Sequence, residues 1–154
     1  MDDGDLRRAY DALAEAARSG EFGSPPAGEW TATQVLAHVI ASDRAMCAAT
    51  AELLDDGEPS FVNDAAQRLM VLDAIVASCE GLDELIVEMR RQGRELCALV
   101  QMLDESVAAR TVSVHLTDHD DVRVHGPMPW QTILAIHAAS HLPTHTAQLE
   151  SLRN

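Results

Sequence analysis

The stretch WQTILAIHAASHLPTHTAQLESL, residues 130–152, carries His137, His141 and His145 at successive spacings of four. Gln148 follows three residues later. On an α-helix a spacing of four keeps side chains within about 40° of one another, so these four residues share one side of a predicted helix. Leucines and isoleucines of the same stretch fall near that side, which therefore faces inward. A buried polar group without a partner is costly, and one metal ion can be the partner of several imidazoles at once.

The composition predicts a single, mostly helical domain that spans residues 1–154. Hydrophobic residues make up 47% of the chain, which is enough for a proper core, but aromatic residues make up only 3%. The core must therefore be built from Ala, Leu, Val, Ile and Met. Abundant Ala, Leu, Glu and Gln favour helices over strands.

The charge balance excludes several classes of partner. The chain has 11 basic and 25 acidic residues, for a formal net charge of -14. Such a surface repels phosphate backbones and anionic membranes. No apolar run approaches the roughly 20 residues of a membrane span, and the first residues do not resemble a secretory signal. Three cysteines without a CxxC pair are typical of a reducing compartment. We therefore expect a cytoplasmic protein that binds neither nucleic acid nor membrane.

Apolar periodicity predicts a four-helix bundle, and a short β-hairpin is expected before its last helix. A Gly- and Pro-rich loop, GEFGSPPAGEW, should separate the first two helices, and Thr31 or Thr33 can cap the second. Alternation in TVSVHL and VRVH predicts the hairpin before the last helix. Gly93 lies in a heptad seam, where it would permit a close approach of two helices. The expected helices span about 5–20, 31–55, 63–78, 82–103 and 130–152, the third being a shorter helical stretch, and the hairpin lies within 109–129.

The pair His141 and His145 has a metal-ligand spacing, because two imidazoles one turn apart can reach one ion. A third ligand must come from elsewhere, and His38 is the natural choice. It is the only histidine on the other long helices, and it lies beside a core stripe. Three neutral histidines would leave a coordination position open for water or substrate, which is the arrangement of a catalytic site.

Two segments resemble the DinB-like superfamily, which includes the metal-binding domain of mycothiol-dependent maleylpyruvate isomerases. They are GEWTATQVLAHVIASDRAM, with Trp30 and His38, and HLPTHTAQLESLR, with His141, His145 and Gln148. The resemblance covers nearly the whole chain in element order, although its specific residues are few. It implies a four-helix bundle with an up-down-down-up path and a metal held by His38, His141 and His145.

The resemblance also implies a function. Activities in that superfamily are thiol-dependent transfers and isomerisations that use mycothiol, bacillithiol or glutathione. We expect a divalent metal, zinc or nickel, that binds a thiol or water, lowers its pKa and delivers it as the nucleophile. A small-molecule substrate and a low-molecular-weight thiol are then the expected partners, and the chain is expected to form a homodimer.

The chain departs from the family pattern at several positions. Pro143 lies between two of the proposed ligands, where proline normally kinks a helix. Thr146 and Ala147 replace the Arg-Gly that is common before the family's glutamine. His137 adds an imidazole that could displace or supplement a ligand. Two alternatives therefore stay open: a non-catalytic, dimeric metal-binding or sensing module, and a metal-free bundle in which the histidines only pack.

Other polar residues have simpler interpretations. We expect Gln148 to brace a helix or a ligand, and Asp43, which lies in an apolar stripe, to pair with an arginine or histidine of another helix. The cysteines are expected to pack in the interior rather than act as nucleophiles. Histidines and aspartates of the hairpin look like a second metal cluster, but ordinary strand and turn residues explain them better: His115, Asp118, His119, Asp120, Asp121 and His125.

Overall fold

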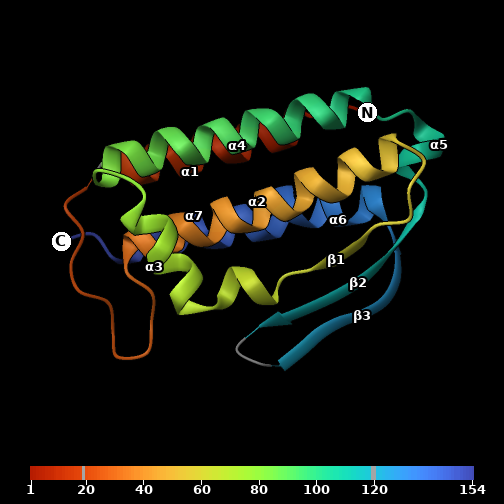
Figure 1. The fold of residues 1–154 in the computed structure, drawn as a ribbon. Coiled ribbons are helices and arrows are strands. Elements are labelled where there is room, and N and C mark those ends of the chain that lie inside the picture. The colour runs from red at the N-terminus through yellow and green to blue at the C-terminus, as the bar shows by residue number, and fades with distance from the viewer. Residues whose placement is uncertain (19, 119–120) are drawn as a thin grey trace.

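The computed structural model describes residues 1–18, 20–118 and 121–154, and it is mostly helical with a small three-stranded sheet (Figure 1). In chain order its helices and strands are α1 (Gly4–Arg18), α2 (Ala32–Leu54), β1 (Ser60–Val62), the 3₁₀ turn η1 (Asp64–Gln67), α3 (Leu69–Ala77), α4 (Leu82–Met102), α5 (Glu105–Ala108), β2 (Thr111–Asp118), β3 (Asp121–Pro129), α6 (Trp130–Ile136), the π-helical turn η2 (His137–His141) and α7 (Leu142–Ser151).

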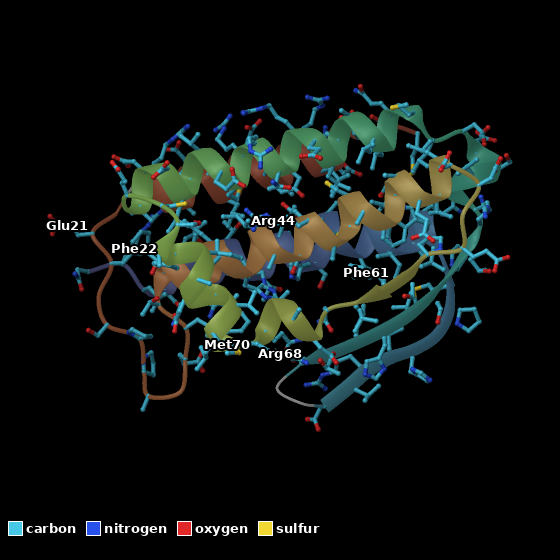
Figure 2. All side chains as sticks on the ribbon, viewed as in Figure 1. Glu21, Phe22, Arg44, Phe61, Arg68 and Met70 are labelled. Atoms are coloured by element: carbon cyan, nitrogen blue, oxygen red, sulfur yellow. The ribbon has the colours of Figure 1, made fainter. Side chains whose placement is uncertain are left out.

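The long helices lie side by side in two layers. Helices α1 and α4 form one layer, and α2 with the α6–α7 run forms the other (Figure 1). The sheet covers the side of α2 and α6 that faces away from α1 and α4. Phe61 of β1 points toward the helices (Figure 2), where its ring meets Trp130 edge to face at 5.6 Å. Apart from a few aromatic residues such as these, the core consists of Ala, Leu, Val, Ile, Met and Cys, as the composition predicts.

Helix α2 begins at a capping box. Thr31 is the N-cap: its Oγ1 accepts a hydrogen bond from Gln34 N at 3.3 Å, and Gln34 Oε1 accepts one from Thr31 N at 3.0 Å. This reciprocal pair satisfies two donors that a helix N-terminus otherwise leaves open. Of the two expected caps, the structure uses Thr31. The helix is therefore fixed two turns before His38.

Helices α1 and α4 approach closely at Gly93. A Cβ on this glycine would lie 2.9 Å from Cδ1 of Tyr10, and both residues are buried. The close approach that the heptad seam predicts is confirmed, and the Tyr10 ring occupies the space that a larger residue would need.

The third expected helix, 63–78, is wrong as a continuous element. Arg68 is extended, with φ -78° and ψ 120°, and it separates the turn η1 from helix α3. Asn63 ties this segment to β2, because its Nδ2 donates to Thr117 O at 2.9 Å and its Oδ1 accepts from Thr117 N at 2.8 Å. The break leaves the carbonyl of Ala66 outside any long helix and available to another residue.

The last helix, expected as one α-helix over 130–152, contains a π-helical turn. The N–H of Leu142 bonds to the carbonyl of His137, five residues earlier. Pro143 lies two residues after the end of this turn; it has no N–H, and its ring would clash with a carbonyl four residues back in a regular α-helix. The wider turn accommodates the proline and lets the helix continue. Such turns occur frequently at functional sites.

Strands β2 and β3 pair antiparallel, with His115 opposite His125. This agrees with the predicted alternation, while part of the expected turn, His119 and Asp120, lies outside the described residues. Strand β1 was not predicted; it pairs parallel to β2. Among the described residues, no helix combines the length and apolarity that a membrane span requires.

We predict that Gly93→Ala destabilises the protein by about 1–3 kcal/mol, because the added methyl overpacks the contact with Tyr10. Alanine is otherwise the better helix former by up to about 1 kcal/mol, so a net loss would isolate the steric effect. Urea denaturation measures the difference, and Arg94→Ala, at an exposed position of the same helix, is the control. A more stable Gly93→Ala protein would show that the two helices can separate without cost.

Candidate metal centre

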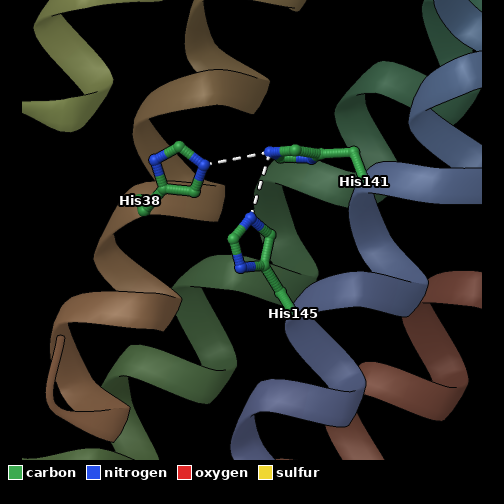
Figure 3. Close-up of side chains that lie close together, drawn as sticks. All are labelled: His38, His141 and His145. Atoms are coloured by element: carbon green, nitrogen blue, oxygen red, sulfur yellow. Dashed lines mark hydrogen bonds between the residues drawn. The ribbon is translucent and has the colours of Figure 1, made fainter. Parts of the chain in front are cut away.

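Helix α2 and the last helical run, α6–η2–α7, bring three imidazoles together. His38 comes from α2, His141 ends the π-helical turn, and His145 lies one turn into α7 (Figure 3). The Nε2 atom of His141 lies 2.9 Å from Nε2 of His38 and 3.3 Å from Nε2 of His145. One ring nitrogen from each residue lies within 4.8 Å of the others, so the cluster could hold a metal ion. These are the three residues that the sequence predicts as ligands.

Outer hydrogen bonds fix two of the three rings. His38 Nδ1 lies 2.7 Å from the carbonyl oxygen of Ala66, which can only accept, so Nδ1 carries the proton. His145 Nδ1 lies 3.0 Å from Gln148 Oε1 and donates to it in the same way. In neutral rings the other nitrogen, Nε2, is then unprotonated. Two lone pairs therefore point at His141 Nε2, which can donate a proton to only one of them.

The spacing of the nitrogens suits a first-row divalent ion. Zinc–nitrogen bonds of about 2.0–2.1 Å place two ligands roughly 3.3 Å apart at a tetrahedral angle and roughly 2.9 Å apart at a right angle. Two of the three distances between the ring nitrogens, 3.3 and 2.9 Å, match these values, and all three nitrogens lie within 4.8 Å of one another. The outer bonds from Ala66 and Gln148 are also the kind that orient metal-ligating histidines. The residues present fit a divalent metal.

His141 differs from the other two because its Nδ1 has no acceptor. This buried atom has no hydrogen-bond partner among the described residues. Its ring is held by stacking instead: the His137 ring lies parallel to it within 26°, at a centroid distance of 4.8 Å. The orientation of His141 therefore depends on His137.

Burial keeps the cluster neutral. His38 is 5% exposed and His145 is 8% exposed. Desolvation by burial, together with the nearby His145, lowers the pKa of His38 to about 4. Burial likewise lowers the pKa of His141 well below its usual value, and that of His145. At neutral pH the imidazoles are uncharged, with one ring nitrogen free of a proton, which is the form that binds metals.

Trp30 covers one side of the cluster. Its ring lies 4.7 Å from the His38 ring and 6.4 Å from the His145 ring, stacked on the latter within 27°. His38 and His145 are buried, whereas His141 is only partly so. His141 is therefore the most exposed of the three histidines.

Asp43 and His137 form a buried pair beneath the cluster. His137 Nε2 lies 3.0 Å from Asp43 Oδ1 and 3.1 Å from the hydroxyl of Tyr10. The sequence predicts an arginine or a histidine of another helix as the partner of Asp43, and the structure shows a histidine of the last helix. Because His137 Nε2 faces Asp43, it does not point into the cluster of three nitrogens.

The other histidines and the cysteines considered as functional residues lie outside the cluster of His38, His141 and His145. His115 and His125 face each other across the sheet, with their Nδ1 atoms 3.1 Å apart on a largely exposed surface. Cys47 and Cys97 are buried, which raises the pKa of Cys47 to about 12 and that of Cys97 to about 11. Neither thiol is activated as a nucleophile, in agreement with the prediction that the cysteines pack.

Comparison with known proteins adds no relative: no family model matches the chain, and no curated protein or solved structure matches it significantly. The interpretation of the site therefore rests on its own chemistry.

Sequence reasoning missed two contributors to the site. The carbonyl of Ala66 carries no side-chain signal, and it became available only through the break at Arg68. Tyr10 appeared in the sequence as one apolar position of a helix. Its hydroxyl could have been singled out, because a buried tyrosine usually finds a polar partner.

We predict that the metal-free protein loses stability as pH falls from about 6.5 to 4, in part because of His38. Its folded-state pKa is below the unfolded value, so the unfolded chain binds the extra proton first and acid favours unfolding. His38 should contribute up to about 1.4 kcal/mol per pH unit in this window. Urea denaturation with a chelator, on native protein and His38→Gln, measures the contribution. Equal pH slopes for the two proteins would contradict the buried neutral state of His38.

Proposed function

We propose that this chain is a DinB-like metalloprotein in which His38, His141 and His145 hold one divalent ion, zinc or nickel. The main support is the tautomers of His38 and His145, which Ala66 and Gln148 fix by hydrogen bonds. As a result the Nε2 lone pairs of both rings converge on His141. Without a cation, at most one of those lone pairs can receive a proton from His141. We further propose that the long helices form the up-down-down-up four-helix bundle of that superfamily, with a hairpin before the last helix.

The proposed activity is a thiol-dependent transfer or isomerisation on a small electrophile. A divalent ion at this position supplies Lewis acidity, which lowers the pKa of a coordinated thiol or water. The chain's own residues hold the site neutral, exclude water on the side of Trp30 and leave His141 partly accessible. A thiol from solution is favoured over a protein thiol, because burial raises the pKa of Cys47 and Cys97.

A non-catalytic metal-binding or sensing module, acting as a homodimer, is the second candidate. The cover that Trp30 provides and the burial of His38 and His145 favour it, because structural metal sites are closed. The two candidates share the ligand set and differ in whether a thiol reaches the ion.

We predict one divalent ion per chain in native protein or after reconstitution with zinc or nickel. His38→Ala and His141→Ala should each lose stoichiometric binding, because two imidazoles alone leave the site incomplete. His125→Ala, which changes an exposed histidine of the sheet, should retain it. Elemental analysis after gel filtration gives the ratio. If neither native nor reconstituted protein holds stoichiometric metal, the centre is wrong and the histidines only pack.

We predict that mycothiol, bacillithiol or glutathione changes the absorption of the cobalt-substituted protein and is transferred to an electrophile. A sulfur bound to cobalt should add a charge-transfer band, which His141→Ala should abolish. Cys79→Ser serves as the control, because Cys79 is the least buried of the three cysteines and could otherwise react with the electrophile. If no thiol gives either the band or turnover, the module is the better description.

A further inference from the structure

Asp43 is a buried carboxylate whose polar neighbours among the described residues are His137 and Tyr10. It is 0% exposed, and neither of its oxygens receives a well-directed hydrogen bond among the described residues. The other buried carboxylate in the described part of the chain, Asp3, is bonded to Arg7 and Gln101. A buried charge without such partners is among the most costly features of a fold, and an apolar or amide side chain would serve the core better.

The contacts of Asp43 lead to the metal centre. Its Oδ1 lies 3.0 Å from His137 Nε2, and Tyr10 OH approaches the same nitrogen at 3.1 Å. The His137 ring in turn stacks on His141, the one cluster histidine whose Nδ1 lacks an outer acceptor. Asp43 thus fixes His137, and the His137 ring in turn orients His141.

The charge of the site gives Asp43 a second role. Three neutral imidazoles add no negative charge, so a divalent ion among them would keep its full charge of +2 inside the protein. A carboxylate one ring away lowers the free energy of that state. Without the ion the same carboxylate is disfavoured, and burial raises its pKa accordingly.

We propose that Asp43 is the counter-charge and positioning residue of the metal centre, acting on His141 through His137. This inference rests on the proposed ion at His38, His141 and His145. It also makes a distinctive prediction: removing the charge should stabilise the metal-free protein and weaken metal binding. A residue with a merely structural role would leave metal affinity unchanged.

The test compares native protein with Asp43→Asn, which keeps the shape and removes the charge. We expect a higher melting temperature for the metal-free variant and a cobalt dissociation constant roughly 10- to 100-fold larger, the range found for outer partners of metal ligands. Thr50→Val is the matched control on the same helix. Thr50 is fully buried, donates a hydrogen bond to Met46 O and accepts one from Trp130 Nε1. The Thr50→Val substitution should therefore lower the melting temperature without changing cobalt affinity.

Two results would overturn the inference. One is an Asp43→Asn protein that binds cobalt as tightly as native protein; the other is a metal-free Asp43→Asn protein that is less stable than native protein or fails to fold. His137→Gln provides a second measurement, because it removes the stacked ring and should alter the visible absorption of bound cobalt. If native protein binds no cobalt, the proposed metal centre itself is wrong. If native protein binds cobalt and Asp43→Asn binds it equally tightly, only the proposed role of Asp43 is wrong.

Discussion

The convergence of three imidazole nitrogens is the constraint on which the rest of the site depends. The lone pairs of His38 and His145 meet at His141 Nε2, and outer bonds prevent either ring from offering a proton instead. In the metal-free chain this arrangement opposes folding, since only one lone pair can be satisfied. An ion would turn the same arrangement into a link between α2 and the last helix, about a hundred residues apart. Metal binding and folding are then thermodynamically coupled.

The π-helical turn reconciles the ligand pair with Pro143. A proline between ligands four residues apart would ordinarily bend the helix and separate them. Here the wider turn ends at His141, two residues before the proline, so the helix continues and both imidazoles still face α2. The same turn carries His137 at its start and His141 at its end, with their rings stacked. The proline therefore belongs to the local geometry that sets the spacing of the histidines.

Much of the fold could be predicted because it depends on local patterns. The capping box at Thr31 and the periodicity of α1, α2 and α4 act within a few residues of sequence, and Gly93 marks the close helix contact. The three clustered histidines could be singled out because two of them share a helix-turn spacing and His38 is the only histidine on the other long helices. Strand β1 was missed because three residues give too short an alternation, and it forms only by pairing with β2, about fifty residues later.

The parts of the site that could not be predicted are tertiary. The helix pattern over 63–78 is interrupted at Arg68, in a segment that Asn63 ties to β2, and that break frees the backbone carbonyl that orients His38. No side-chain pattern reports a free carbonyl. Tyr10 and His137 are likewise separated by more than a hundred residues, so their contact depends on how the helices pack. Sequence thus identifies the atoms that could bind an ion, whereas their tautomers and orientation are set by packing.

Asp43 and the three histidines place several destabilising groups in one region of the core. Selection for stability alone would replace them with apolar residues of similar volume, since buried ionic and polar groups are commonly neutral or unfavourable to folding. Sites that depart from the stable choice in this way are typical of functional regions. These unfavourable groups also fit together, because a cluster of neutral imidazoles and a nearby carboxylate are complementary only in the presence of a cation. That complementarity involves Asp43 and all three histidines together, and it is the feature by which this region could hold a metal ion.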